Sequence, residues 1–529
     1  MPFLPARLLA RHRAFAAALI VAAALRLIAE LGYRWAIWFN DSFDYVAIAL
    51  HPRPDQVRSG GYPLLLWVLK PFHSVAVVTG LQHALALAGA VVLYALLRRI
   101  GLPGWGATLA VVPLLFDAYQ IQLEQLLLGD TLAEFLLIVA AVAVLWWFPA
   151  TRRGRPSGPA TGAAVLVAAV AGLAFGAAAV TRTVALPLAV AGLVYLIVVR
   201  AGWRAVTAAA AAAAAPLAGY AIWFHSVHGV YSLDSADGVF LWARTAAFAE
   251  CGTIKPPPAE AYLCPRLPPS RRAASSSQVW QSDSPLDWSR GQVFSVQENA
   301  AARRFALRAI AAQPGGYAST VLAGVGRTFS WNRAPYPSAY VADSYKFSHT
   351  KTQLRNWPVT IGGGNSKAVT TTTQLVARDY AGGDPATDVV RPFSTVMAGY
   401  QRYAYLRGTL LGIIMLITPA ALVAADLRDR RRTGGTGRRG DRRLSGPAWL
   451  CWAVAVTLIV IPPMTVDFDY RYVLPAIPFG CAAVALAIGR LRAGPTRRSP
   501  DSPAAASIRT VPELTATDDL TDAEAAADG

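Results

Sequence analysis

Long apolar runs, separated by short polar segments, constrain the fold of this chain more than any other feature of its sequence. A helix needs about 20 predominantly apolar residues to cross a lipid bilayer. Only 15% of the residues are charged, whereas soluble globular proteins carry about 25%. The sequence therefore predicts an all-α polytopic membrane protein with about ten transmembrane helices. The predicted helices cover residues 14–31, 75–97, 105–115, 125–148, 161–180, 184–199, 205–224, 405–425, 448–463 and 473–488.

The arginines and the loop carboxylates fall on opposite sides of these predicted helices. The net charge of +18 would suit a nucleic-acid partner, but most arginines cluster in short segments beside apolar runs, as topology signals do. Segments 98–99, 152–155 and 428–443 are basic and share one predicted side. We predict cytoplasmic N- and C-termini and a plasma-membrane location, with no nucleic-acid partner. The Ala- and Arg-rich composition is typical of a bacterium with a GC-rich genome.

Residues 226–402 are too long for a linker and contain many aromatic, Gly and Pro residues, so we expect an ordered exoplasmic module of mixed short helices and loops. Residues 297–312 have helical periodicity, and packing on this module is favoured over a position on the membrane surface. Cys251 and Cys264 form a disulfide or remain free thiols. The predicted regions are an N-terminal transmembrane module (1–225) with the first exoplasmic loop (32–74), the exoplasmic module (226–402), C-terminal transmembrane helices (403–492) with a basic cytoplasmic loop (426–446), and a disordered cytoplasmic tail (493–529).

The first exoplasmic loop contains two carboxylates at helical spacing. Asp41, Asp44 and Tyr45 would share one face of a short helix, at positions i, i+3 and i+4. Such a carboxylate lies close to the head groups of the bilayer and can accept a proton from a hydroxyl group. The alternative is that Asp41 caps the helix and that Asp44 is solvated.

The second exoplasmic turn supplies Glu124, Asp130 and Glu134. Asp130 and Glu134 form an i, i+4 pair at the start of an apolar helix, where Asp130 could instead act as a helix cap. Glu134 lies about one turn inside the predicted membrane helix, which is costly unless it faces the protein interior or a hydrated cavity.

Two arginines, Arg182 and Arg471, lie at helix ends on the same predicted face. Guanidinium groups bind phosphate oxygens bidentately and stabilise a phosphate that leaves during a reaction. Anchoring at the membrane interface, or a local pair between Asp469 and Arg471, would also explain these residues. Walker A, GxGxxG, HExxH and GxSxG motifs are absent from the sequence.

Five short motifs frame nearly all of the predicted transmembrane part. They are Asp41-Ser42-x-x-Tyr45, Arg58-Ser-Gly-Gly-Tyr62-Pro63, Gln120-x-Gln122-x-Glu124, Leu128-Gly129-Asp130-Thr131 and Arg471-Tyr472-Val-Leu-Pro475. The motifs resemble those of the GT-C superfamily of integral-membrane glycosyltransferases, both in their order along the chain and in their predicted location on one side of the membrane. The resemblance is to the branch near the dolichyl-phosphate-mannose protein mannosyltransferases and the lipid A aminoarabinose transferases. It does not extend to residues 226–402.

This resemblance implies a polyprenyl-phosphate sugar donor, inversion at the anomeric carbon, and Asp41 as the catalytic base, with Asp44 as its rival. Asp130 matches a second acidic position, which in some relatives joins catalysis or holds a metal ion. A divalent metal ion, if bound, would therefore contact Asp41 and Asp130, and no other cofactor is implied. The donor phosphate would contact arginines. The implied substrate-binding residues are Tyr45, Arg58, Tyr62, Glu124, Glu134, Arg182, Arg471 and Tyr472.

The function predicted from the sequence is thus transfer of a hexosyl or pentosyl group to an exoplasmic acceptor hydroxyl. The acceptor is a glycan, a lipid or a protein, with the cell envelope favoured. A transporter or flippase for a lipid-linked or polysaccharide substrate is the alternative, and a non-catalytic assembly protein is a third possibility. The enzyme hypothesis predicts that Asp41, Asp130 and Arg471 surround one cavity that opens sideways to lipid.

Overall fold

The computed structural model describes residues 6–147, 162–281, 284–286, 293–350, 356–361, 369–383, 386–432 and 444–492 of the chain. Residues up to Arg492 form one compact unit. The predicted disordered tail (493–529), the basic segment 152–155 and most of the basic loop 426–446 lie outside the described residues. The division of residues 1–492 into three regions stays a prediction.

The described part of the chain contains eight helical spans that are long and apolar enough to cross a membrane. The chain is therefore an all-α polytopic membrane protein, as predicted. The spans are α1 (Ala6–Gly32), α4 (Val75–Ile100), α7 (Asp130–Trp147), α8 (Gly162–Thr181), α10 (Trp203–His228), α19 (Gly408–Arg432), α20 (Ser445–Thr465), and the run of α21 (Tyr470–Val473), η6 (Leu474–Ala476) and α22 (Ile477–Arg492).

Two of the ten predicted transmembrane segments are helices of only 13 residues. They are α5 (Gly104–Phe116) and α9 (Leu186–Val198), which follows η2 (Thr183–Ala185). Helix α5 continues into α6 (Ala118–Gln125) after a bend of 49°, and the pair would make a ninth span if counted as one. The bend has a local cause, because the side chain of Asp117 accepts a hydrogen bond from the backbone N–H of Tyr119 and caps α6.

The predicted span 125–148 begins later than expected, at Asp130. Residues before it are extended, because the backbone of Ile37 bonds to both Gln125 and Leu127. This backbone pairing fixes the chain between α6 and α7 and places the first turn of α7 beside the loop that follows α1.

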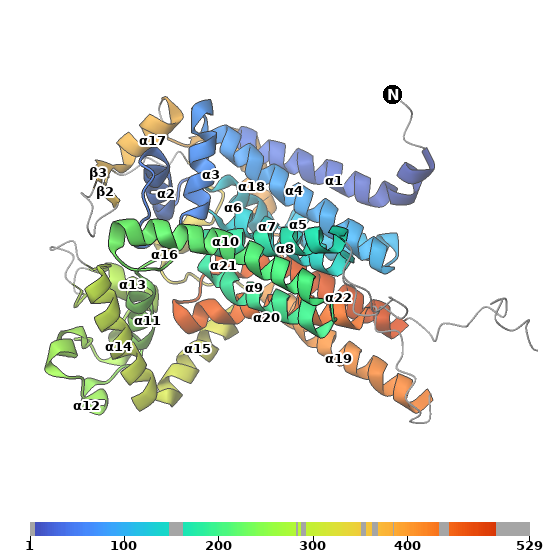
Figure 1. Cartoon of the computed structure of the whole chain (residues 1–529). Coiled ribbons are helices and arrows are strands. Elements are labelled where there is room, and N and C mark those ends of the chain that lie inside the picture. The colour runs from blue at the N-terminus through green and yellow to red at the C-terminus, as the bar shows by residue number, and fades with distance from the viewer. Residues whose placement is uncertain are drawn as a thin grey trace, which may run out of the picture. The chain divides into compact units, whose positions relative to one another are not determined.

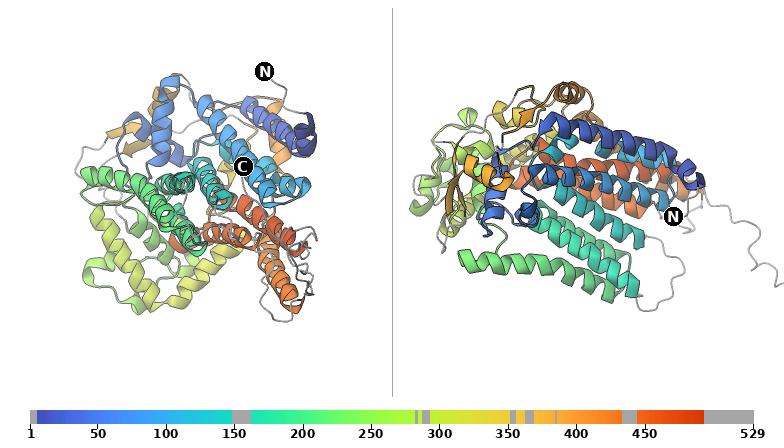
Figure 2. Two further views of the ribbon diagram at one scale, coloured as in Figure 1. Left: turned by 45° about the vertical axis from the view of Figure 1, so that its right-hand side comes forward. Right: turned by 90° about the horizontal axis from the view of Figure 1, so that it is seen from above.

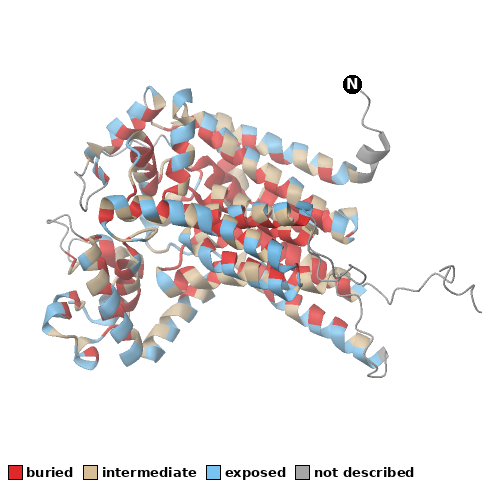
Figure 3. Ribbon diagram, viewed as in Figure 1, coloured by how far each residue is buried: buried red, intermediate tan, exposed pale blue. Residues whose placement is uncertain are grey.

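Small residues allow α8 and α10 to pack closely. A Cβ atom at Gly172 would lie 2.0 Å from the carbonyl oxygen of Ala209, and one at Gly176 would lie 2.3 Å from that of Ala213. Close approach through small residues is a common way for membrane helices to associate. Exposed residues lie along the outer faces of the bundle (Figure 3), and many of them are large and apolar, as expected for a surface in contact with lipid. Examples are Leu166, Val190, Val198, Ile222 and Leu416.

Most of the shorter elements gather at one end of the bundle, away from the start of α1 (Figures 1 and 2). We call this the cavity end. The helices are α2 (Asn40–Leu50), α3 (Gly61–Leu69), α11 (Asp237–Ala246), α12 (Cys251–Ile254), α13 (Ser275–Trp280), α14 (Val296–Ala312), α15 (Pro314–Thr328), α16 (Ala339–Ser344), α17 (Thr373–Ala381) and α18 (Phe393–Gln401), with the short helices η1 (Lys70–Phe72), η3 (Pro258–Leu263) and η4 (Pro269–Arg271).

Two small antiparallel sheets complete this end. Strand β1 (Tyr33–Arg34) pairs with β4 (Asp388–Val389), with Tyr33 opposite Val389. Strand β2 (Pro358–Ile361) pairs with β3 (Val369–Thr372), with Pro358 opposite Thr372. The β1–β4 pair ties the loop after α1 to a segment of the predicted exoplasmic module.

The predicted exoplasmic module contains its own small apolar core, built mainly by α11 and α14. Trp242 is fully buried there, and its indole N–H donates to the carbonyl of Leu263. Helix α14 covers the predicted segment 297–312 and packs on this core, as favoured from the sequence. Cys251 and Cys264 form a disulfide, so the pairing that the sequence left open is confirmed.

Candidate active site at the cavity end

A cavity of about 1350 Å³ lies among the ends of the spans and the elements of the cavity end. Nine of the eleven side chains predicted from the sequence to form the site line it, namely Asp41, Asp44, Tyr45, Arg58, Asp130, Glu134, Arg182, Arg471 and Tyr472. Asp41 is only 6% exposed. The structure therefore places Asp41, Asp130 and Arg471 around one cavity; its opening sideways to lipid and the roles of these residues stay predictions.

Helix α2 positions the first-loop carboxylates. Its start is fixed by Ser42, whose hydroxyl accepts the backbone N–H of Phe39, while Asp41 lies in the first turn. A carboxylate in the first turn interacts favourably with the helix dipole. Tyr45 is buried against Tyr62 with the two rings edge to face, which anchors the helix face that also carries the carboxylates.

Asp41 is held between two guanidinium groups. Its Oδ1 lies 2.7 Å from Nη2 of Arg58, and its Oδ2 lies 2.8 Å from Nη2 of Arg471. Burial acts to raise the pKa of Asp41, but the charges of Arg58 and Arg471 outweigh it and lower the pKa to about 2. Asp41 is consequently ionised and is a weak proton acceptor while both arginines contact it.

Asp44 is in a different electrostatic environment from Asp41. Its Oδ2 lies 3.0 Å from Nε of Arg58. Desolvation raises the pKa of Asp44 although its side chain is 34% exposed; the charge of Arg58 opposes this effect, those of Asp55 and Asp41 reinforce it, and the pKa is about 6. A carboxylate with a pKa near the operating pH is an effective general base. The two carboxylates, three residues apart, are therefore chemically distinct.

The two arginines at the helix ends share one aromatic side chain. The guanidinium carbons of Arg182 and Arg471 lie 5.1 Å and 5.2 Å from the ring centre of Tyr472. Arg182 forms an ion pair of 2.7 Å with Oδ1 of Asp130. The Nε and Nη1 atoms of Arg471 are buried and have no hydrogen-bond partner among the described residues. Arg471 thus retains donors that an anion in the cavity could use.

The local pair between Asp469 and Arg471 also exists, but it is looser than the contact with Asp41. Nε of Arg471 lies 3.6 Å from Oδ2 of Asp469. Asp469 mainly caps α21 through the backbone N–H of Arg471 and accepts a hydrogen bond of 2.8 Å from the hydroxyl of Tyr345. Asp469 therefore anchors the segment that carries Arg471.

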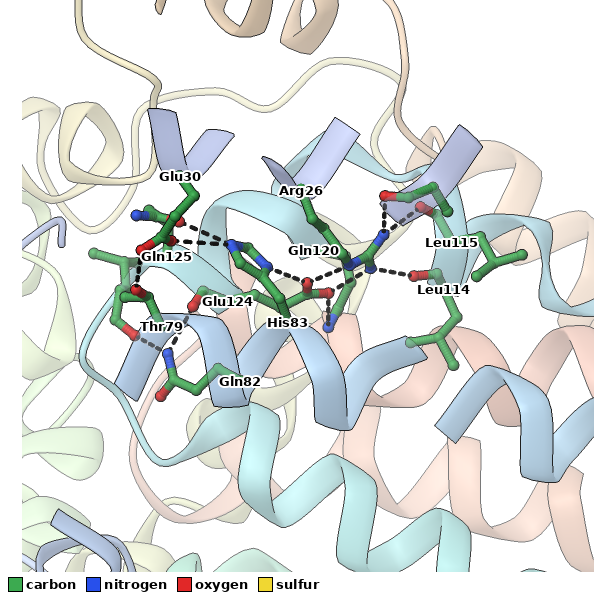
Figure 4. Close-up of polar contacts among 12 residues, drawn as sticks. Arg26, Glu30, Thr79, Gln82, His83, Leu114, Leu115, Gln120, Glu124 and Gln125 are labelled. Atoms are coloured by element: carbon green, nitrogen blue, oxygen red, sulfur yellow. Dashed lines mark hydrogen bonds and ion pairs between the residues drawn. The ribbon is translucent and has the colours of Figure 1, made fainter. Parts of the chain in front are cut away.

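Two of the predicted substrate-binding residues, Tyr62 and Glu124, do not line the cavity. The hydroxyl of Tyr62 donates to Oε1 of Gln82 at 2.7 Å inside the bundle. Glu124 is fully buried and binds Arg26 through two contacts of 2.7 and 2.8 Å. It also contacts Nδ1 of His83 at 2.8 Å (Figure 4). Tyr62 and Glu124 thus contact side chains inside the bundle and do not reach the cavity.

Some lining residues were not predicted from the sequence. The segment 226–402, which carries no recognised motif, contributes aromatic and polar side chains to the wall, including Trp280, Gln281, Tyr340 and Trp357. No sequence signal identifies them. Arg26, the buried partner of Glu124, could have been identified from the sequence, because a charged residue inside an apolar run must face a polar environment.

The arrangement of Asp41 and Asp130 does not fit a divalent metal ion. Both oxygens of Asp41 and one oxygen of Asp130 contact guanidinium groups, whose positive charge disfavours a second cation there. Within the described ranges, no group of three His, Cys, Asp or Glu side chains is arranged to hold a metal. The described acidic residues therefore provide no metal site of the kind that the sequence resemblance left open.

Comparisons with known proteins give a distant structural likeness. No protein-family model and no curated protein matches the sequence. The crystal structure of the Archaeoglobus fulgidus oligosaccharyltransferase in the apo form is similar to this chain, with 11% sequence identity and a TM-score of 0.41. The match covers 90% of this chain and 50% of that protein, so the chain spans about half of the length of the oligosaccharyltransferase.

Proposed function

We propose that this protein is a membrane glycosyltransferase that moves a sugar from a polyprenyl-phosphate donor to an acceptor hydroxyl. The observation that carries the proposal is one cavity in which two carboxylates with different pKa values lie with three arginines, one of which, Arg471, has buried N–H groups without a hydrogen-bond partner among the described residues. We further propose that the cavity end is exoplasmic, that both termini are cytoplasmic, and that the membrane is the plasma membrane of a bacterium.

The donor phosphate is best placed at Arg471, because its Nη1 has no hydrogen-bond partner among the described residues and its Nε has only the loose 3.6 Å contact with Asp469. Arg58 and Arg182 line the same cavity and add positive charge. These groups would stabilise the negative charge on the phosphate as it leaves. The cavity wall continues along apolar side chains of α7, α9 and α20, which suits a prenyl chain; they include Leu137, Leu186, Pro187, Leu458 and Ile461.

In the proposed reaction, the acceptor oxygen forms a bond to the anomeric carbon as the bond from that carbon to the phosphate oxygen breaks. The leaving polyprenyl phosphate retains the bonding electron pair. Attack from the face opposite the phosphate inverts the configuration. The acceptor proton passes to a carboxylate, and we assign this role to Asp44, because its pKa is about 6 whereas that of Asp41 is about 2. Asp41 then holds Arg58 and Arg471 in place.

The sequence resemblance favours Asp41 as the base, and the assignment to Asp44 rests on the electrostatics. Donor phosphate that attracts Arg471 would weaken the contact between Arg471 and Asp41. Because the charge of Arg471 contributes to the low pKa of Asp41, such a contact would raise that pKa. Separate substitutions of the two carboxylates therefore distinguish the two assignments.

Complementation of a gene deletion tests the proposed function. Asp44→Asn and Arg471→Ala should each lower the glycan product by about a hundredfold or more, measured by mass spectrometry of envelope glycans. Asp379→Asn provides the control, because Asp379 is exposed on α17 and does not line the cavity. Its product level should equal that of the wild type.

The same cells distinguish a transferase from a flippase by the position of the unused donor. Loss of a transferase leaves the sugar donor in the exoplasmic leaflet, where an added glycosidase can reach it. Loss of a flippase leaves the donor in the cytoplasmic leaflet. Protection of the accumulated donor from glycosidase, or normal product from Asp44→Asn, would contradict the assignments made above.

A further inference from the structure

Two carboxylates on one side of α7 each present an unused oxygen. Asp130 and Glu134 are four residues apart and both line the cavity. Each is only 2% exposed. Neither Oδ2 of Asp130 nor Oε1 of Glu134 has a hydrogen-bond partner among the described residues. Since buried polar atoms nearly always have a partner, these two acceptors indicate where a bound molecule or water donates hydrogen bonds.

The second oxygen of each carboxylate is fixed. Oδ1 of Asp130 contacts Arg182 at 2.7 Å, and Oε2 of Glu134 accepts a hydrogen bond of 2.8 Å from Nε2 of Gln120. These contacts restrict the rotation of both carboxylates, so that the unused oxygens are preorganised. Glu134 forms no ion pair with any described residue, and a bound hydrogen-bond donor would therefore supply its missing partner.

A polar network inside the bundle holds Gln120, the residue that orients Glu134 (Figure 4). Nε2 of Gln120 also lies 3.3 Å from Oε1 of Glu124. Glu124 is fixed by Arg26 and His83, and the guanidinium of Arg26 donates further to two backbone carbonyls of α5. The network thus joins α1, α4, α5, α6 and α7. Such a buried network is costly unless every member is satisfied.

The chemistry of this pair excludes phosphate as its ligand. A phosphodiester carries no hydrogen-bond donor for these oxygens, and the unpaired N–H groups of Arg471 offer phosphate a better site. The two fixed oxygens instead suit a molecule with neighbouring hydroxyl groups, such as a sugar ring, because a hydroxyl can donate or accept a hydrogen bond. Such hydrogen bonds would satisfy buried polar atoms that otherwise lack a partner.

We propose that Asp130 and Glu134 form the subsite for the sugar ring, accepting hydrogen bonds from its hydroxyls, and that Gln120 positions Glu134. This inference rests on the proposed function, which supplies the phosphate-linked sugar. It also orients the donor, with its phosphate at Arg471, its sugar at the start of α7, and its prenyl chain along the apolar wall.

The test compares binding of decaprenyl phosphate with binding of its esters to glucose, galactose, mannose and arabinose, using full-length protein in nanodiscs. The wild type should bind at least one ester. Glu134→Leu should weaken binding of that ester about ten- to a hundredfold, with binding of bare decaprenyl phosphate unchanged. Glu134→Gln retains an acceptor and should preserve most of the affinity for the ester.

Two further variants distinguish failure of the sugar subsite from failure of the phosphate site. Gln120→Leu should reduce the preference for the ester over the bare phosphate while Arg471→Ala should weaken both. The matched control is Glu250→Gln, because Glu250 is exposed, does not line the cavity and lies outside the network of Figure 4. The control should keep wild-type affinities for both probes.

Equal weakening of both probes by Glu134→Leu, or an unchanged affinity for the ester, would overturn the sugar subsite. Unchanged binding of bare decaprenyl phosphate to Arg471→Ala would instead remove the phosphate site of the proposed function. In that case the effect of Glu134→Leu on the ester still decides the subsite. A wild-type protein that binds none of the esters would overturn both proposals.

Discussion

The assignment of the catalytic base can be tested through the pH dependence of sugar transfer. The pKa of Asp44 is raised from its usual value of 3.8 to about 6, whereas that of Asp41 is lowered to about 2. A general base acts only in its ionised form. If Asp44 is the base, kcat/KM should fall about tenfold for each pH unit below 6, and by about a hundredfold at pH 4. If Asp41 retains its low pKa and is the base, kcat/KM should stay constant between pH 4 and pH 7.

Two other processes do not explain a fall in kcat/KM below pH 6, namely ionisation of the donor and unfolding caused by protonation of Asp41 or Asp44. A polyprenyl-phosphate sugar is a phosphodiester, which lacks the second ionisation that phosphate monoesters show near pH 6. The raised pKa of Asp44 means that the folded state binds its proton more tightly than the unfolded state, so this group favours folding as the pH falls from 6 to 3.8. The lowered pKa of Asp41 contributes stability above pH 3.8 that is lost only as the pH falls towards 2.

The assay measures kcat/KM for release of labelled sugar from the donor by reconstituted protein between pH 4 and pH 8. Asp44→Asn should abolish the limb with an apparent pKa near 6 and leave a low, flat residual rate. Asp379→Asn should reproduce the wild-type profile, because Asp379 is exposed outside the cavity. A wild-type rate that is constant down to pH 4 would refute the assignment of Asp44 as the base.

Three further predictions concern the scaffold. Arg26→Met should destabilise the protein by about 3–5 kcal/mol, because Glu124 is left buried without its cation; thermal unfolding in detergent should show that Glu124→Met in the same chain restores much of the loss. Cys251→Ser should destabilise the segment around the disulfide by about 3 kcal/mol, and proteolysis there no faster than in the wild type would contradict this. Gly172→Ala should cost about 1–3 kcal/mol, because the added carbon would lie 2.0 Å from a carbonyl oxygen of α10, and an unchanged melting temperature would show that the two helices can separate freely.

Much of the fold was predictable, because the length and apolarity of a run determine whether it can span a membrane. The sidedness of the loops also predicted that Asp41 and Arg471 lie at the same face, although they are 430 residues apart. Helices α5 and α9 were predicted as spans, but each has only 13 residues. Hydropathy did not reveal that Asp117 ends α5 and caps α6 after a bend.

Less of the site was predictable, because the chemical state of a carboxylate depends on its neighbours in space. Asp41 and Asp44 are alike in the sequence, and the charges that surround each of them in space separate their pKa values: mainly Arg58 and Arg471 at Asp41, and Asp55 and Asp41 in addition to Arg58 at Asp44. Glu124 was expected to bind substrate, yet it is fully buried against Arg26. A charge within an apolar run indicates a buried partner but does not identify it.

The wall of the cavity has two origins, the membrane spans with their adjoining loops and the segment 226–402. Residues proposed to contact the donor all come from the first of these, whereas Trp280, Tyr340 and Trp357 come from the second. Under the proposed function, replacement of segment 226–402 would change one part of the cavity wall and leave in place the residues proposed to contact the donor. Exchange of this segment would then offer a route to transferases that deliver the same sugar to a different acceptor.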